Sequence, residues 1–238
     1  MNDNAIAQEI DRELRAKGTV DRATKEKAYL KSDLDHYGAS VPDIRSVTKS
    51  VSRKYGPLGH DELVAVVTAL WAVPVHERRM AAVELLDQNV AALRSRDIKL
   101  LERLLREART WALVDSLAAS VVGNLLERDP GLGSVLDRWA TDGDFWIRRS
   151  ALLTLLGGLR RGAGDFDRFS RYADAMLEEK EFFVRKAIGW ILRETAKKRP
   201  ELVYEWVLPR ASRASGVTLR EAVKPLSEAQ RKAVLSAR

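Results

Sequence analysis

The chain has 238 residues, of which 45% are hydrophobic, so it is long enough for one large domain or two small ones with a substantial buried core. It contains no cysteine, which excludes disulfides, cysteine-ligated zinc or iron–sulfur sites and cysteine nucleophiles. Its three histidines lie in separate segments, so we expect no metal site, while the formal net charge of +7 favours a polyanionic partner.

The N-terminal residues include acids and amides where a secretory signal peptide would have a basic and then an apolar run. The longest apolar run, 63–75, is short for a membrane span and is interrupted by Thr68 and Pro74. We therefore expect a cytoplasmic protein without membrane contact.

Apolar residues recur with a period near 3.6 from end to end, and no alternating segment is convincing as a strand, which predicts an all-α fold. We expect Asp21 to cap a second helix that continues through Leu34 until Gly38 breaks it. The third helix should start near Pro42. The other expected helices are 3–16, 60–73, 75–93, 96–108, 110–128, 132–140, 144–159, 165–178, 181–197, 200–210, 219–225 and a short tail from Ser227.

Short connections between these helices indicate antiparallel pairs, which predicts a HEAT-like helical-repeat solenoid, an α-α superhelix. A compact orthogonal bundle is the alternative, because periodicity alone does not separate the two. No linker is long or polar enough to divide the chain, so we expect residues 1–238 to form a single domain.

A helix that starts after Thr110 places Trp111 and Asp115 one turn apart on the same face. The other helical neighbours of Asp115 are alanines, so on an inward surface this carboxylate lies against an apolar wall beside an indole. Two interpretations remain open from the residues alone. Asp115 is either a structural acid bonded to a distant arginine or helix N-terminus, or an acid kept for chemistry.

The helix near residue 148 carries two arginines with different surroundings. Arg148 has Asp144 four residues before it, whereas the helical neighbours of Arg149 are aromatic or aliphatic. Arg149 must therefore find its partner outside its own helix, either Asp115, exposed carbonyl groups or a ligand. We place Trp146 of the same helix in the core.

The segment 182–193 has an apolar stripe and an opposite basic stripe. Its predicted core residues are Val184, Ala187, Ile188 and Ile191, whereas Trp190 shares the opposite stripe with Lys186, Arg193 and Lys197. An indole on a basic face favours contact with a nucleic acid, and packing against a neighbouring repeat is the alternative.

Two further helices carry aligned cations. Arg45, Lys49 and Arg53 share the outer face of one helix, and Arg220 and Lys224 share a face of another. Each set alone is an ordinary solvated helix face. Gathered on one concave surface, they would contact DNA phosphates.

Several segments resemble the corresponding stretches of AlkD-type DNA glycosylases, the HEAT-like-repeat family of alkylpurine repair enzymes. In the second half these are 110–116, 145–151, 180–194 and 219–224, of which 180–194 is the most specific. Segments 29–31, 41–45 and 70–71 resemble the N-terminal half of that family, so the similarity spans nearly the whole chain.

The resemblance implies roles for individual residues. It matches Asp115 to the catalytic aspartate, Trp111 and Trp190 to the paired tryptophans, and Arg149 to an arginine that grips a phosphate. It also implies a concave basic face that binds double-stranded DNA containing alkylated purines, without a cofactor. The remaining residues expected to contact DNA are Arg148, Tyr29, Arg45, Lys49, Lys186, Arg193, Arg220 and Lys224.

The implied reaction is hydrolysis of the N-glycosidic bond of an N3- or N7-alkylated purine by a monofunctional, monomeric DNA glycosylase. Alkylation makes the base a cationic leaving group, so one carboxylate is enough, and the family works without a base-flipping pocket. The alternatives are a non-catalytic HEAT-repeat scaffold that binds DNA or RNA structures, and a protein-interaction adaptor. Asp115 separates these classes, because a carboxylate at the centre of a pure polyanion-binding surface would repel phosphate.

Overall fold

The computed structural model describes residues 3–238, and the first two residues of the predicted 1–238 domain lie outside this range. Within the described residues the regular structure is helical apart from one isolated bridge between Asp35 and Val75, which confirms the all-α prediction. The chain divides into two compact units, Met1–Leu125 and Leu126–Arg238. That the two units make up one domain stays a prediction.

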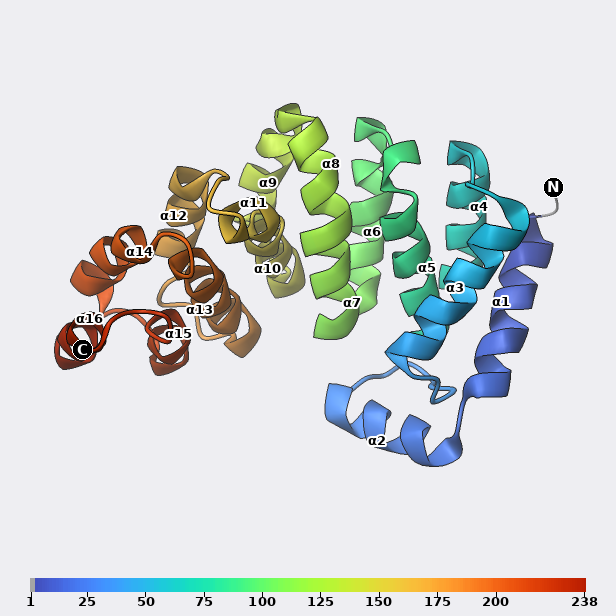
Figure 1. Ribbon diagram of the computed structural model, residues 1–238, viewed down its shortest axis with the longest axis horizontal. Helices are drawn as coiled ribbons and strands as arrows, with labels where there is room; N and C mark the ends of the chain where they lie inside the picture. The colour runs from blue at the N-terminus through green and yellow to red at the C-terminus, as the bar shows by residue number, and fades with distance from the viewer. Residues whose placement is uncertain (1–2) are drawn as a thin grey trace. The chain divides into compact units, whose positions relative to one another are not determined.

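Unit 1 is built around helix α5, which packs against α1, α3, α4 and α7 (Figure 1). The π-helical segment that continues α7 also packs against α5. The helices of this unit are α1 (Asp3–Lys17), α2 (Val20–Leu30), α3 (Val41–Tyr55), α4 (His60–Trp71), α5 (His76–Gln88), α6 (Ile98–Ala108) and α7 (Trp111–Ser116), with short 3₁₀ turns at Val90–Ala92 and Ser95–Asp97.

Helix α3 begins as its sequence predicts. Ser40 caps it, Asp43 completes a capping box, and a proline occupies the first turn. The predicted core residues Ile44, Val47 and Val51 are buried. The spacing of apolar residues therefore sets the orientation of α3 correctly.

Helix α2 differs from its prediction at both ends. Thr19, not Asp21, caps it by accepting a hydrogen bond from the backbone N–H of Arg22. The helix ends at Leu30, before the predicted stop, because Lys31 adopts a left-handed conformation at φ 48°. Figure 1 shows α2 across one end of the other helices of this unit.

The predicted helix 110–128 is continuous but not uniform. It comprises α7, a π-helical segment at Leu117–Val122, and α8 (Gly123–Arg128), which crosses the boundary between the units. The backbone N–H of Gly123 reaches back five residues to the carbonyl of Ala118, the bond that defines a π turn. Such π segments are rare in helices and are frequent at functional sites.

Unit 2 is organised around α13, which packs against α10, α11, α14 and α15. Gly189 allows α15 to approach α13 closely, because a Cβ there would lie 2.8 Å from the carbonyl oxygen of Thr218 in α15. The helices are α9 (Gly133–Trp139), α10 (Phe145–Leu153), α11 (Leu156–Arg160), α12 (Phe166–Ala175), α13 (Phe182–Ala196), α14 (Pro200–Val207), α15 (Gly216–Ala222) and α16 (Glu228–Ser236), with 3₁₀ turns at Pro130–Leu132 and Leu208–Arg210.

The single helix predicted at 144–159 is two helices, α10 and α11. Near the end of α10 the hydroxyl of Thr154 donates to the carbonyl of Ser150, and Ser150 donates in turn to the carbonyl of Trp146, both at 2.8 Å. Back-bonding of this kind bends helices. Two adjacent glycines, at 157 and 158, weaken the helical preference just beyond.

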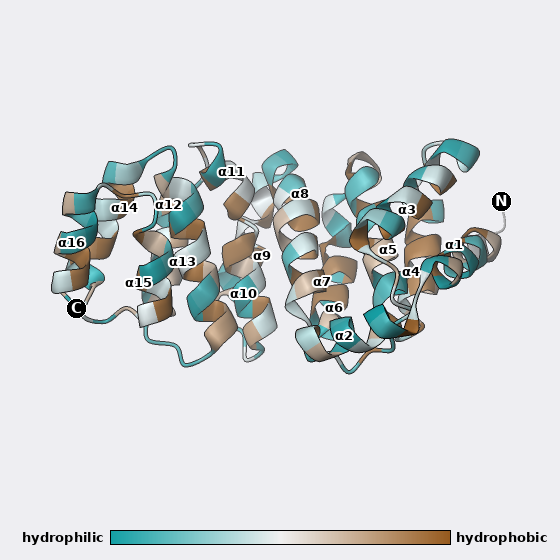
Figure 2. Cartoon of the chain, turned by 60° about the horizontal axis from the view of Figure 1, so that its bottom comes forward, coloured by the Kyte–Doolittle hydropathy of each residue, from teal (hydrophilic) through white to brown (hydrophobic). Residues whose placement is uncertain are grey.

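Most helices show one hydrophobic and one hydrophilic face, and the hydrophobic faces turn toward neighbouring helices in the same unit (Figure 2). In the described part of the chain, 3–238, no helix combines the length and apolarity needed to cross a membrane.

Candidate functional site

Helix α7 presents an aromatic ring and a carboxylate on its accessible side. Leu113 and Val114 are fully buried, whereas Trp111 and Asp115 are half-buried. The ring of Tyr29, from α2, meets Trp111 edge to face at 6.0 Å and is itself 73% exposed. The structure thus brings two of the predicted site residues, Tyr29 and Trp111, into contact one helical turn from Asp115.

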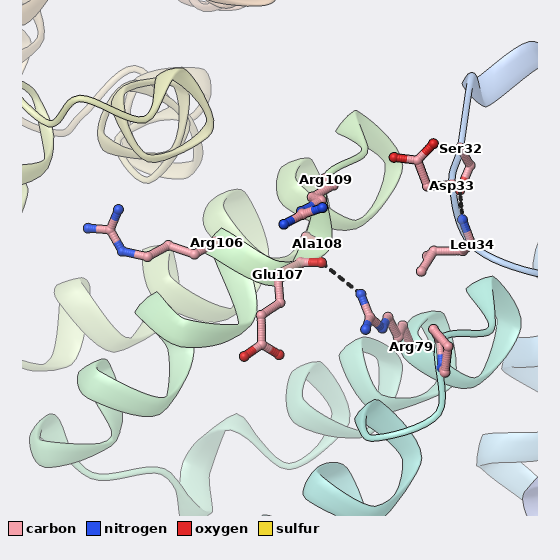
Figure 3. A pocket seen from close by; sticks show the side chains of 9 residues that line it. Ser32, Asp33, Leu34, Arg79, Arg106, Glu107, Ala108 and Arg109 are labelled. Atoms are coloured by element: carbon pink, nitrogen blue, oxygen red, sulfur yellow. Dashed lines mark hydrogen bonds between the residues drawn. The ribbon is translucent and has the colours of Figure 1, made fainter.

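A pocket of about 470 Å³ adjoins the segments that carry these residues (Figure 3). Ser32, Asp33 and Leu34, which line one side of the pocket, follow Tyr29 closely in the chain. Arg109, which also lines it and has a left-handed backbone at φ 48°, directly precedes Thr110 at the start of α7. The lining residues are Ser32, Asp33, Leu34, Pro74, Arg79, Arg106, Glu107, Ala108 and Arg109. Sequence reasoning missed this pocket, although two closely spaced arginines just before Trp111 were an available signal.

Arg79 is a cation of the pocket whose position is fixed by packing and hydrogen bonding. Its guanidinium donates to the backbone carbonyl of Glu107 at 2.7 Å and lies over the ring of Trp71 at 5.0 Å. The indole N–H of Trp71 donates to the Glu107 carboxylate at 2.9 Å, and burial lowers the pKa of Arg79. Within residues 3–238 the buried Nε of Arg79 has no hydrogen-bond partner.

The predicted cations of α3 are exposed, as the helical pattern indicates. Arg45 is also engaged within unit 1, because its Nε donates to the carboxylate of Glu84 on α5 at 2.9 Å. Lys49 lies one turn further along the same helix. The positive charge of this face is therefore partly balanced near Arg45.

Arg148 in unit 2 links α10 to two neighbouring segments of the chain. It donates to the carbonyls of Asp142 and Gly143, at 2.6 and 3.0 Å, and forms an ion pair with Glu179 beyond α12. Asp144, which helical spacing offers as its partner, instead caps α10 by accepting from the backbone N–H of Trp146. These contacts make Arg148 a stabilising residue whether or not it also contacts DNA.

Arg149 is only 3% exposed. It donates to the carbonyl of Phe183, near the start of α13, and lies 5.9 Å from the ring of that residue. Trp146 is buried, as predicted, with its ring 4.9 Å from that of Phe183. Arg149 therefore finds a carbonyl partner outside its own helix, one of the roles expected from the sequence, and its contact with a phosphate stays a prediction.

The two stripes predicted for α13 are confirmed. The four predicted core residues are completely buried, whereas Trp190 is half-buried and Lys186 is exposed beside the ring of Phe182. Trp190 follows Gly189, so its backbone lies at the tight contact between α13 and α15.

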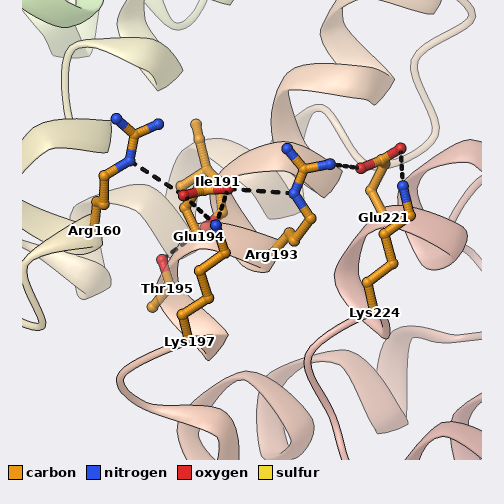
Figure 4. Close-up of polar contacts among 8 residues, drawn as sticks. All are labelled: Arg160, Ile191, Arg193, Glu194, Thr195, Lys197, Glu221 and Lys224. Carbon is orange, nitrogen blue, oxygen red and sulfur yellow. Dashed lines mark hydrogen bonds and ion pairs between the residues drawn. The ribbon is translucent and has the colours of Figure 1, made fainter.

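The cations near Trp190 are paired to a greater extent than the sequence suggests (Figure 4). Glu194 meets Arg160, Arg193 and Lys197 at 3.2, 3.3 and 2.8 Å. Although burial opposes it, these cations hold the pKa of the Glu194 carboxyl below its usual value. The network reduces the positive charge of this surface.

A second carboxylate, Glu221, continues this network. It pairs with Arg193 and, at 2.8 Å, with Lys224. Arg220, on the same helix, is exposed. The pairs of Glu194 with Lys197 and of Glu221 with Lys224 are local, three residues apart, and could have been predicted from the sequence. Only packing brings Arg160 to Glu194 and Arg193 to Glu221.

Comparison with known proteins gives a consistent result. Residues 10–226 match the family described as DNA alkylation repair enzyme. No curated protein sequence matches significantly.

Three solved structures are similar in fold. A "Predicted DNA alkylation repair enzyme from Enterococcus faecalis" is 23% identical, with a TM-score of 0.79 over 89% of this chain and 98% of the other. The protein smu.31 from Streptococcus mutans UA159 is 16% identical, with a TM-score of 0.61 over 93% and 100% of the two chains. AlkD2 from Streptococcus mutans is 17% identical, with a TM-score of 0.60 over 86% and 99%. Because the family match extends over most of its length, the chain belongs to the DNA alkylation repair enzyme family.

Proposed function

We propose that this member of the family is a monofunctional DNA glycosylase that hydrolyses the N-glycosidic bond of cationic N3- or N7-alkylated purines in duplex DNA. The observation that carries the proposal is the accessible face of α7, where Asp115 follows one turn after Trp111 and Trp111 contacts the exposed Tyr29. A carboxylate beside two aromatic faces suits a substrate that becomes cationic at its sugar.

The proposed chemistry needs one carboxylate. The bond between C1′ and the purine nitrogen breaks with its electron pair moving to the base, which leaves as a neutral alkylpurine and requires no proton. Asp115 stabilises the positive charge that develops at C1′ and orients the attacking water. The water oxygen bonds to C1′, and its proton passes to solvent or to Asp115. The hydrolysis calls for no redox step.

The aromatic residues and cations supply binding. Trp111 and Tyr29 offer ring faces to the sugar and the edge of the lesion, and Trp190 in unit 2 offers a further indole. Arg149 is proposed to grip a phosphate, and the pocket that contains Arg79 provides an additional place for an anionic group. Selectivity then comes from the lability of the alkylated bond, so a pocket for a flipped base is not required.

The decisive experiment is the Asp115→Asn variant, because an amide is nearly isosteric but lacks the charge. We expect single-turnover release of 7-methylguanine to fall by roughly 10²- to 10³-fold, the range for removal of a group that stabilises charge in the transition state. Binding to lesion DNA and the melting temperature should stay close to those of the wild type. Asp167→Asn, which changes an exposed carboxylate on α12, is the matched control and should leave all three measurements unchanged.

A non-catalytic scaffold is the second candidate. It is favoured by Arg149, which is 3% exposed and donates to the carbonyl of Phe183, and by the bracing role of Arg148. On this reading Asp115→Asn lowers the melting temperature, and neither protein releases 7-methylguanine while both bind DNA. Unchanged release by the variant, with reduced stability, would remove Asp115 from the chemistry.

A further inference from the structure

Three segments of unit 1 bring a histidine and two glutamates together. Glu26 lies on α2, His36 lies in the loop that follows, and Glu77 lies in the first turn of α5. One ligand atom from each lies within 4.8 Å of the other two. Glu77 is completely buried, and the other two are half-buried.

Backbone contacts place His36 in this cluster. The backbone N–H of Asp35 donates to the carbonyl of Pro74 at 3.0 Å, and the N–H of His76 donates to the carbonyl of Asp35 at 2.8 Å. The rings of His36 and His76 then stack, with centroids 4.8 Å apart and planes at 8°. The orientation of the His36 ring is thus defined by packing.

The Glu77 carboxylate is held by backbone donors. Its Oε1 accepts from the N–H groups of Gly38 and Ala39, at 2.6 and 3.2 Å, and its Oε2 accepts from the N–H of Tyr37 at 3.0 Å. A carboxylate can accept about four such contacts, so one position on Oε2 remains. Gly38 is required in this loop, because its φ is +84° and a Cβ there would lie 2.1 Å from the carbonyl of Thr19.

The other two members carry buried polar atoms that make no hydrogen bond among the described residues. In the described part of the chain, the buried Oε2 of Glu26 and both buried ring nitrogens of His36 make no hydrogen bond. Glu26 is paired only through its other oxygen, at 3.6 Å from Arg22. Burial lowers the pKa of His36, which favours the neutral imidazole that ligates metals. Buried polar atoms without partners require an explanation, and a cation bound between them is one.

We propose that Glu26, His36 and Glu77 bind one divalent transition-metal cation, with Zn²⁺ the best match to one imidazole nitrogen and two carboxylate oxygens. Because Zn²⁺ binds nitrogen and oxygen at about 2.0–2.2 Å, two ligands on one ion lie at most about 4.4 Å apart. A small side-chain movement closes the cluster from 4.8 Å. Water fills the remaining coordination positions.

The proposed ion would tie α2 to the start of α5. Helix α2 also carries Tyr29, which packs against Trp111 and lies less than one turn from Glu26, so the ion would steady that aromatic contact. The proposal does not depend on glycosylase activity. The three ligands come from three separate segments, so no ligand spacing within one segment of the sequence indicates the site.

The test is metal titration of tag-free protein after treatment with a chelator. We expect calorimetry to show one Zn²⁺ per chain, Co²⁺ to give a saturable visible spectrum, and Zn²⁺ to raise the melting temperature. His36→Gln and Glu26→Gln should each weaken binding by at least about ten-fold. The control is His60→Gln: the two His60 nitrogens pair with different carboxylates, Asp61 at 2.7 Å and Asp97 at 2.9 Å, and this variant should bind like the wild type.

The melting temperature of metal-free Glu26→Gln shows whether weaker metal binding by this variant is due to loss of folding. The substitution removes a carboxylate that lies beside the buried Glu77, so the variant's melting temperature without metal should equal or exceed that of the wild type. Failure of the wild type to bind Zn²⁺ or Co²⁺ saturably overturns the proposal. Binding that is the same in wild type, His36→Gln and Glu26→Gln overturns it as well, because the ion then lies elsewhere.

Discussion

The contact between α13 and α15 makes a quantitative prediction at Gly189. A Cβ added there would lie 2.8 Å from the carbonyl oxygen of Thr218, 3.0 Å from the Cα of the same residue and 2.9 Å from the Cβ of Glu221. Two of these atoms belong to the backbone, so they cannot move aside without shifting α15. Gly189→Ala therefore forces the two helices apart.

Two effects compete in this variant. Alanine favours a helix over glycine by up to about 1 kcal/mol, whereas overpacking of a tight contact costs about 1–3 kcal/mol. Since the clash at Gly189 is with backbone, we expect the upper part of that range and a net loss of about 1–2 kcal/mol in the free energy of unfolding. The melting temperature should then fall by about 2–4 °C for each kcal/mol.

Gly157→Ala is the matched control, because Gly157 is also helical and lies in the same unit. A Cβ there would meet only the ends of two flexible side chains, Arg161 at 3.5 Å and Glu127 at 3.6 Å. This variant should be as stable as the wild type or more stable. Urea denaturation of both variants measures the difference, and binding to lesion DNA reports whether displacement of α13 moves Trp190. A Gly189→Ala protein that is at least as stable as Gly157→Ala would refute the steric reasoning.

Three further predictions concern binding and pH. Tyr29→Ala should weaken binding to lesion DNA by about 1–3 kcal/mol without changing the melting temperature, since Tyr29 is 73% exposed against Trp111, and Val20→Ala at the other end of α2 should change neither quantity. Affinity for duplex DNA should fall with added salt, with a logarithmic slope of about −0.9 for each phosphate neutralised, and a flat dependence would contradict binding through the backbone. Although burial opposes it, hydrogen bonds from Tyr37 and two arginines lower the pKa of Asp11 to about 2, so its contribution to stability is present above pH ~4 and is lost as the pH falls toward 2. Denaturation curves of Asp11→Asn and wild type should accordingly differ at pH 7 and converge in that acidic range, and a constant difference would rule out this linkage.

Most of the helices could be located from the sequence because helix periodicity and capping are local. The buried stripe of α13, the start of α3 at its capping box and the exposed cations of α3 all follow from the identities of residues three and four positions apart. The ends of α2 and the break between α10 and α11 were less predictable. Helix α2 ends because Lys31 adopts a left-handed conformation, and α10 ends where the hydroxyl of Thr154 bonds to the backbone. In both places the free energy of ending the helix is close to that of continuing it.

The candidate site also has one part that the sequence predicts and another that only the fold brings together. The spacing of Trp111 and Asp115 on one helical face is a property of the sequence, because both belong to one turn of α7. The contact of Tyr29 with Trp111, and the ion pair of Arg193 with Glu221, join segments far apart in the chain. No periodic pattern encodes such pairs.

What the sequence by itself determined, then, was the all-α class, the core faces of the helices, and the residues through which the chain resembles a DNA repair family. Only the tertiary structure decided that Arg149 donates to the carbonyl of Phe183 and that Glu26, His36 and Glu77 converge. The physical reason is the sequence separation of the interacting residues. A helix repeats every 3.6 residues, so its buried face follows from residues a few positions apart. Hydrogen bonds and ion clusters between helices depend on which helices pack together and on how far each is shifted along the other's axis.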